Sequence, residues 1–126
     1  KVKERKFYDI SRTISRSVWQ ISETMPLNKV VTMTKTGYTA RMIARFKLKQ
    51  PIIAVTANRV VKNQLAFVYR VFTLLVEYEE EQDKILSVAK TLCDRGVLEE
   101  DQIVLFTAGF STYQKHSSNI SEIHTI

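Results

Sequence analysis

The stretch KVVTMTKTGYT, residues 29–39, decides the fold of this chain. Its first half, residues 29–34, is a short run rich in β-branched residues, which predicts a buried strand. Gly37 interrupts this run, and apolar residues then recur at helical spacing over residues 39–46, which predicts a helix. A strand, a glycine turn and a helix in this order form the repeating unit of α/β folds.

The same unit recurs on the C-terminal side, where short and mostly apolar runs alternate with helical patterns. The expected strands are residues 51–56, 71–77 and 102–107. The expected helices are 58–69, with Asn58 as N-cap, and a later one that starts among Glu79, Glu80, Glu81 and Asp83 and ends at a glycine C-cap, Gly96. On the N-terminal side, apolar residues at steps of three and four predict an amphipathic helix over about residues 4–25, which Pro26 ends.

Helices that alternate with short apolar strands imply a mostly parallel sheet covered on both faces, which is a three-layer α/β/α fold. A fifth strand is expected at residues 119–126, where apolar and polar residues alternate imperfectly. Residues 108–118, which precede it, form a polar loop with no helical pattern. Because a parallel crossover needs about a dozen residues or more, the fifth strand is predicted to run antiparallel to the fourth.

Length and composition indicate one globular domain, residues 1–126, since 44% of the residues are hydrophobic and 25% are charged. No apolar run approaches the ~20 residues of a membrane-spanning helix, so we expect no membrane partner and a cytoplasmic location. The net charge of +6 would suit nucleic acid, but the basic residues are dispersed along the chain, which makes nucleic acid an unfavoured partner.

Catalytic and metal-binding patterns are not visible in the sequence. The single cysteine, Cys93, excludes an internal disulfide and is expected to be a buried, inert thiol. His116 and His124 are expected at the surface or at a sheet edge. We therefore expect no catalytic residue, no metal and no cofactor in this chain.

The candidate functional residues lie in the turn between the first strand and its helix. They are Thr34, Lys35, Thr36, Gly37 and Thr39. Such a turn lies beyond the carboxyl end of a strand, where α/β sheets bind their ligands. Hydroxyls can donate to phosphate oxygens, the glycine lets the backbone approach closely, and the lysine supplies charge. The turn therefore predicts a site for a phosphorylated ligand, to which Arg41 adds a second cation if it faces the turn.

A purely structural explanation competes with this one, because a threonine can cap a helix and a glycine can form a turn without any ligand. Capping explains one threonine, but not three together with a lysine, so we favour the binding site. The spacing matches neither a Walker A loop nor a dinucleotide fingerprint. A second loop at the same sheet edge would form the opposite wall of the crevice. Its expected residues are Gly109, Ser111, Thr112, Lys115, Ser117 and Ser118.

Two blocks of the sequence resemble the C-terminal domain of pyruvate kinases, namely residues 30–45, which contain the turn, and PIIAVTAN at 51–58. The segments YRVF at 69–72 and IVLFTAG at 103–109 fit the same pattern. The resemblance extends from about Tyr8 to the end of the chain.

The resemblance implies a five-stranded sheet in the order 3-2-1-4-5 with the last strand antiparallel. It also implies a domain that binds a phosphorylated allosteric effector, a sugar phosphate or a nucleotide, on the two loops and that contacts other subunits of an oligomer. The barrel domain of the family would be its partner and would hold Mg²⁺ and K⁺. The parent protein, rather than this chain alone, would transfer phosphate from phosphoenolpyruvate to ADP.

The chain departs from the family in residues 77–101. Relatives that respond to fructose 1,6-bisphosphate carry a tryptophan and an arginine in a longer segment at this place, whereas this segment is short, acidic and free of tryptophan. A single-phosphate effector is therefore expected, and loss of regulation stays open. The alternative interpretation is a free-standing binding module for a phosphorylated metabolite.

Overall fold

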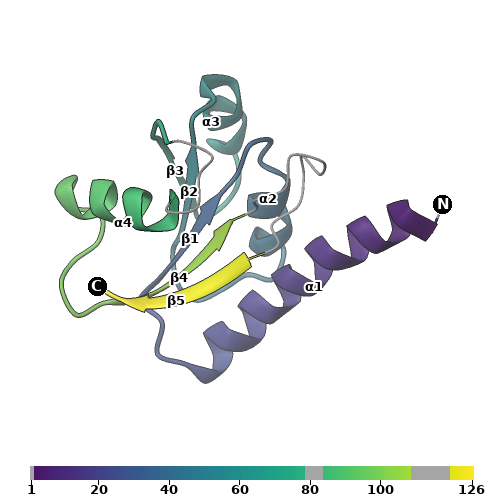
Figure 1. Cartoon of the computed structure of the whole chain (residues 1–126), viewed down its shortest axis with the longest axis horizontal. Helices are drawn as coiled ribbons and strands as arrows, with labels where there is room; N and C mark the ends of the chain where they lie inside the picture. The colour runs from purple at the N-terminus through teal and green to yellow at the C-terminus, as the bar shows by residue number, and fades with distance from the viewer. Residues whose placement is uncertain (1, 79–83, 109–119) are drawn as a thin grey trace.

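The computed structural model describes residues 2–78, 84–108 and 120–126, and these segments form helices and strands in alternation (Figure 1). In chain order the elements are α1 (Val2–Thr24), β1 (Lys29–Met33), α2 (Tyr38–Ala44), β2 (Ile52–Thr56), α3 (Arg59–Leu65), β3 (Val71–Leu75), α4 (Lys84–Asp94), β4 (Ile103–Ala108) and β5 (Ile120–Thr125). None of the described helices combines the length and the apolar character needed to cross a membrane.

The strands form one sheet in the order β3-β2-β1-β4-β5. β1 is parallel to β2 on one side and to β4 on the other, and β2 is parallel to β3. β5 is antiparallel to β4, with Leu105 opposite Ile123. The three-layer α/β fold, the strand order implied by the resemblance and the direction of the last strand are thus confirmed.

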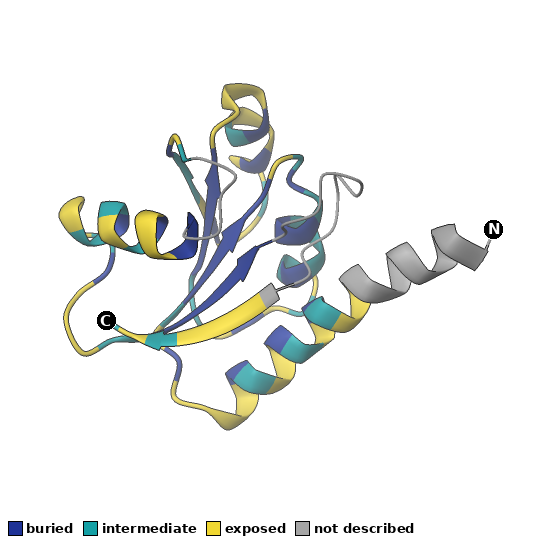
Figure 2. Cartoon of the chain, in the orientation of Figure 1, coloured by how far each residue is buried: buried dark blue, intermediate teal, exposed yellow. Residues whose placement is uncertain are grey.

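Each face of the sheet carries its own apolar core, because successive strand residues point to opposite sides. On one face, Val30 of β1 and Leu105 of β4 pack with α1, α2 and α3; on the other, Val31 and Phe106 pack with α4. Figure 2 shows β1, β2 and β4 buried between the partly exposed helices, whereas β5 is largely exposed. The central strands β1 and β4 are thereby shielded on both faces, which places their carboxyl ends at the edge where a ligand can reach them.

Two helix caps have the geometry that the sequence indicates. The Asn58 side chain accepts hydrogen bonds from the amides of Val60 and Val61, which is the expected N-cap of α3. Gly96 adopts a left-handed conformation after α4, with φ of 75°. The Gly96 amide donates to the carbonyl of Cys93 and the Val97 amide to that of Leu92, the pattern of a glycine C-cap.

Several element ends differ from expectation. α3 ends at Leu65 rather than near Tyr69, because the Val68 amide turns back to the Leu65 carbonyl and the Val68 side chain packs on the core. β3 ends at Leu75 rather than 77, α2 spans 38–44 rather than 39–46, and α1 spans 2–24 rather than about 4–25. The acidic residues Glu79, Glu80, Glu81 and Asp83, expected at the start of α4, lie outside the described residues.

Candidate functional site

The β1–α2 turn, residues 34–39, is held together from within. Gly37 is buried and has φ of 85°, and its amide donates a 2.8 Å hydrogen bond to the Thr34 hydroxyl. A Cβ at this position would lie 3.2 Å from both Nη1 of Arg41 and Cδ2 of Leu65. The turn therefore needs glycine for its backbone angle and for its close packing.

The Thr36 hydroxyl also takes part in the turn, since it accepts a 3.3 Å hydrogen bond from the Tyr38 amide. The Thr36 carbonyl in turn accepts a 3.4 Å hydrogen bond from Nη1 of Arg41. Arg41 thus faces the turn, as the binding hypothesis requires. The hydroxyls of Thr34 and Thr36 thus both help to build the turn.

The start of α2 has no side-chain cap. Its N-cap residue is Gly37, which has no side-chain acceptor, and the Tyr38 amide donates instead to the Thr36 hydroxyl. Thr39 lies in the first turn of α2 and is buried, with 3% of its surface exposed.

The turn forms one wall of an open hollow of about 610 Å³ at the carboxyl ends of β1 and β2. Lys35 lies exposed on one side of the hollow, and Arg59, the first residue of α3, lies on the other. Two further residues of the β2 side are engaged locally: the Thr56 hydroxyl accepts from the Asn58 amide at 3.1 Å, and the Asn58 side chain caps α3. The hollow thus presents two cations beside the turn.

Arg59 and Tyr78 both line the hollow, but neither was predicted as a site residue from the sequence. The available signal was the strand order, because β2 pairs directly with β1 and its following loop must lie next to the turn. The wall that was expected instead, with Gly109, Ser111, Thr112, Lys115, Ser117 and Ser118, lies outside the described residues. The strand that precedes these residues is β4, which ends at Ala108. It pairs with β1 on the side away from β2, with Thr107 opposite Thr32.

No cluster of three or more histidine, cysteine or acidic side chains that could hold a metal occurs in the described segments. Nε2 of His124 lies 2.9 Å from a carboxylate oxygen of Glu122 on β5, which fits the edge position expected for this histidine. Cys93 is only partly buried, against the core on the α4 face.

Comparison with known proteins assigns the fold and the turn to one family. The family model described as the pyruvate kinase alpha/beta domain matches residues 12–124. The chain belongs to this family. This match includes the β1–α2 turn and every described strand up to His124 of β5.

Individual pyruvate kinases are similar over most of this chain. That of Geobacillus stearothermophilus is 33% identical over 118 residues, which is 93% of this chain and 20% of the relative. That of Thermococcus litoralis is 36% identical over 100 residues, which is 79% of this chain and 20% of the relative. The chain thus spans about a fifth of the length of these curated relatives.

A solved pyruvate kinase from Cryptosporidium parvum has the same fold. It superposes with a TM-score of 0.75 at 20% sequence identity. The alignment covers 92% of this chain and 22% of the Cryptosporidium parvum chain. The chain is accordingly a pyruvate kinase C-terminal domain by family and by fold.

Proposed function

We propose that this domain regulates a pyruvate kinase by binding a phosphorylated effector at the β1–α2 turn, and that it contributes to subunit assembly. The parent protein would transfer phosphate from phosphoenolpyruvate to ADP, and its barrel domain would hold Mg²⁺ and K⁺. The effector would contact Thr34, Lys35, Thr36, Gly37 and Thr39. The second wall would come from residues 109–118.

The observation that carries the proposal is the positive charge gathered at a glycine turn beyond the carboxyl end of β1. Gly37 supplies no side-chain acceptor, while Lys35 and Arg41 bring positive charge to the same turn. Oriented amides and cations together form the usual environment of a bound phosphate.

One phosphate group is the ligand that this turn suits best. The described cations nearest to it are Lys35, Arg41 and Arg59, which all lie at or beside the turn. The segment 77–101 contributes no tryptophan that could stack on a second phosphorylated sugar position. We therefore expect a sugar monophosphate or a nucleoside monophosphate to bind more tightly than inorganic phosphate, since both offer further contacts.

Calorimetric titration tests the effector site. Glucose 6-phosphate, AMP and inorganic phosphate are titrated into this chain and into the double variant Lys35→Gln, Thr36→Val. The matched control is Lys90→Gln, which removes one exposed positive charge from α4 on the opposite face of the sheet. The proposal predicts binding that weakens at least about tenfold in the double variant and is unchanged in the control. Absence of binding, or equal binding by all three proteins, would refute the effector site.

The proposed assembly role is supported by exposed apolar side chains on the face that α1 covers. Ile123 of β5 is 41% exposed and pairs with Leu105, whose side chain belongs to this face. Trp19 of α1 is 37% exposed and stacks on Phe46 at 6.2 Å between ring centroids. β5 is also an edge strand, and unpaired strand edges are suited to contacts between chains.

Sedimentation velocity tests assembly through β5. The proposal predicts that this chain associates as its concentration rises and that Ile123→Lys remains monomeric, with Leu86→Lys on α4 as an exposed apolar control. Association that survives Ile123→Lys would exclude β5 as the contact. A barrel encoded upstream in the same reading frame would distinguish the regulatory domain from a free-standing binding module.

A further inference from the structure

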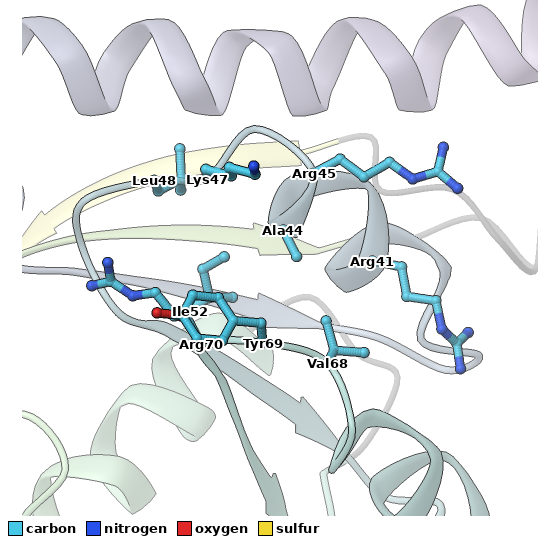
Figure 3. Close-up of a pocket in the computed structure, with 9 residues that line it drawn as sticks. All are labelled: Arg41, Ala44, Arg45, Lys47, Leu48, Ile52, Val68, Tyr69 and Arg70. Carbon is cyan, nitrogen blue, oxygen red and sulfur yellow. The ribbon is translucent and has the colours of Figure 1, made fainter.

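A second cavity, of about 530 Å³, lies between α2 and the segment that leads from α3 into β3 (Figure 3). Its lining includes the loop that precedes β2 and the residues directly before β3, so it opens near the amino ends of these strands. The β1–α2 turn lies at the carboxyl ends of the strands. Arg41 is the residue common to the cavity and the turn.

The floor of the cavity is apolar and firmly anchored. Leu48 and Ile52 belong to the core beneath α2 and are 3% and 2% exposed. Ala44 and Val68 are partly buried and, as Figure 3 shows, their side chains project into the space between the two segments. A ligand with an apolar body would cover the exposed parts of Ala44 and Val68, while Leu48 and Ile52 already belong to the core and need not move.

The rim of the cavity is cationic. Arg41, Arg45, Lys47 and Arg70 line it, and no carboxylate of the described residues lies within 4.0 Å of any of them. Figure 3 shows the guanidinium groups of Arg41 and Arg45 toward one end and that of Arg70 toward the other. Four like charges around one apolar floor repel one another and attract an anion.

The positions of two of these cations are defined by hydrogen bonds to backbone carbonyls. Nη2 of Arg70 donates to the Lys49 carbonyl at 2.8 Å, and Nη1 of Arg41 donates to the Thr36 carbonyl at 3.4 Å. A guanidinium has five N–H groups, so each keeps donors for a ligand. Tyr69 adds an aromatic ring that is 83% exposed at the cavity wall, where it can pack on an apolar or aromatic group.

We propose that this cavity binds a small organic anion, with its apolar body on the floor and its phosphate or carboxylate group among the cations of the rim. This site shares Arg41 with the proposed effector turn but does not depend on a ligand bound there. The apolar floor and the charged rim together select for organic anions, since an inorganic anion cannot contact the floor and a neutral compound cannot pair with the rim.

Heteronuclear NMR of this chain tests the proposal with four probes of known structure. Phenyl phosphate and 4-phenylbutyrate carry both features, whereas inorganic phosphate and benzyl alcohol each carry one. We expect the two organic anions to cause saturable shifts of the amides of residues 45–48 and 68–70. They should bind at least about tenfold more tightly than inorganic phosphate or benzyl alcohol. The relative strength of the two organic anions shows whether the rim prefers phosphate or carboxylate. Inorganic phosphate reports on the turn through the amides of residues 34–39, so the two sites are read separately.

Variants then test the rim and the floor. Arg45→Gln combined with Lys47→Gln should weaken the organic anions about tenfold, and Ala44→Leu should weaken them by filling the floor, while Lys90→Gln on α4 should leave binding unchanged. The proposal is overturned if the organic anions bind no more tightly than their fragments, if residues 45–48 and 68–70 show no saturable shift, or if the folded charge variant binds equally well. The comparison of probes on the unmodified chain decides the question even if a variant does not fold.

Discussion

The backbone amide of Gly37 donates a 2.8 Å hydrogen bond to the hydroxyl of Thr34, a side chain that is only 5% exposed directly after β1. The Thr34 amide in turn donates to the carbonyl of Val55 on the neighbouring strand β2. The β1–α2 turn is therefore tied both to itself and to the sheet. The Thr34 hydroxyl and Gly37, on which the predicted ligand site depends, thus also hold the turn together.

Replacing Thr34 by valine should destabilise the chain by about 1–2 kcal/mol, because the buried amide of Gly37 would lose its acceptor while the shape of the side chain is kept. Urea unfolding followed by circular dichroism measures the change. Thr34→Ser is the control, since serine keeps the hydroxyl, and it should retain most of the stability. A loss in Thr34→Ser as large as that in Thr34→Val would contradict the argument, because serine keeps the hydroxyl and loses only a methyl group.

Gly37→Ala should cost more stability than Gly96→Ala. Both glycines have positive φ, 85° and 75°, so both variants carry the left-handed penalty of about 1–2 kcal/mol. Only at Gly37 would the new Cβ also crowd its neighbours, with Arg41 and Leu65 atoms at 3.2 Å, whereas nothing lies within 4 Å at Gly96. Thermal unfolding of both variants gives the comparison, and a larger loss in Gly96→Ala would contradict it. Gly37→Ala should in addition weaken phosphate binding, because Arg41 must move.

Thr32→Val should leave the chain as stable as before or stabilise it by up to about 1 kcal/mol, because its hydroxyl is fully buried without a hydrogen-bond partner in the described structure. Thr56 is the matched control on the next strand: it is equally buried, but its hydroxyl accepts a hydrogen bond from the Asn58 amide at 3.1 Å. Thr56→Val should therefore destabilise by about 1 kcal/mol. Equilibrium unfolding of the two variants checks the opposite outcomes, and a clear loss in Thr32→Val would reveal a partner for its hydroxyl.

Lys47→Gly should stabilise the chain by about 1 kcal/mol, since Lys47 has φ of 54° in the left-handed region that glycine adopts without penalty. The position follows the C-terminal end of α2, where a left-handed residue commonly ends a helix. Lys49→Gly, in the same loop but without a positive φ, should be neutral or destabilising. Differential scanning calorimetry distinguishes the two, and a lower melting temperature for Lys47→Gly would contradict the argument. The same variant should weaken the organic anions of the second cavity, because it removes one cation of the rim.

The fold could be predicted from local patterns because each strand and helix has a recognisable sequence pattern within a few residues. Asn58 and Gly96 mark helix ends through their own side-chain and backbone chemistry, and both have the predicted geometry. The end of α3 could not be predicted in this way. It depends on Val68 reaching the core, a contact with residues far away in the sequence, so the helical pattern continues beyond the last helical residue.

The candidate site was predictable to the same extent. The turn at residues 34–39 is visible in the sequence as a run of hydroxyls, a glycine and a lysine between a strand and a helix. Its internal hydrogen bonds, the contact of Arg41 with the Thr36 carbonyl and the place of Arg59 in the hollow are not visible, because they join residues through space. The effector-binding role of the turn stays a prediction.

The sequence by itself determined the order of the elements, the direction of β5 and the location of the turn, because periodicity, caps and loop length are local properties of the chain. Only the tertiary structure decided which cations meet. Arg41 lies in α2 and Arg45 at its C-terminal end. Both come together with Arg70, which precedes β3, around one apolar floor. The physical reason is that β1, β2 and β3 are neighbours in one parallel sheet, so the packing of α2 and α3 on one face brings the ends of separate segments to a common cavity.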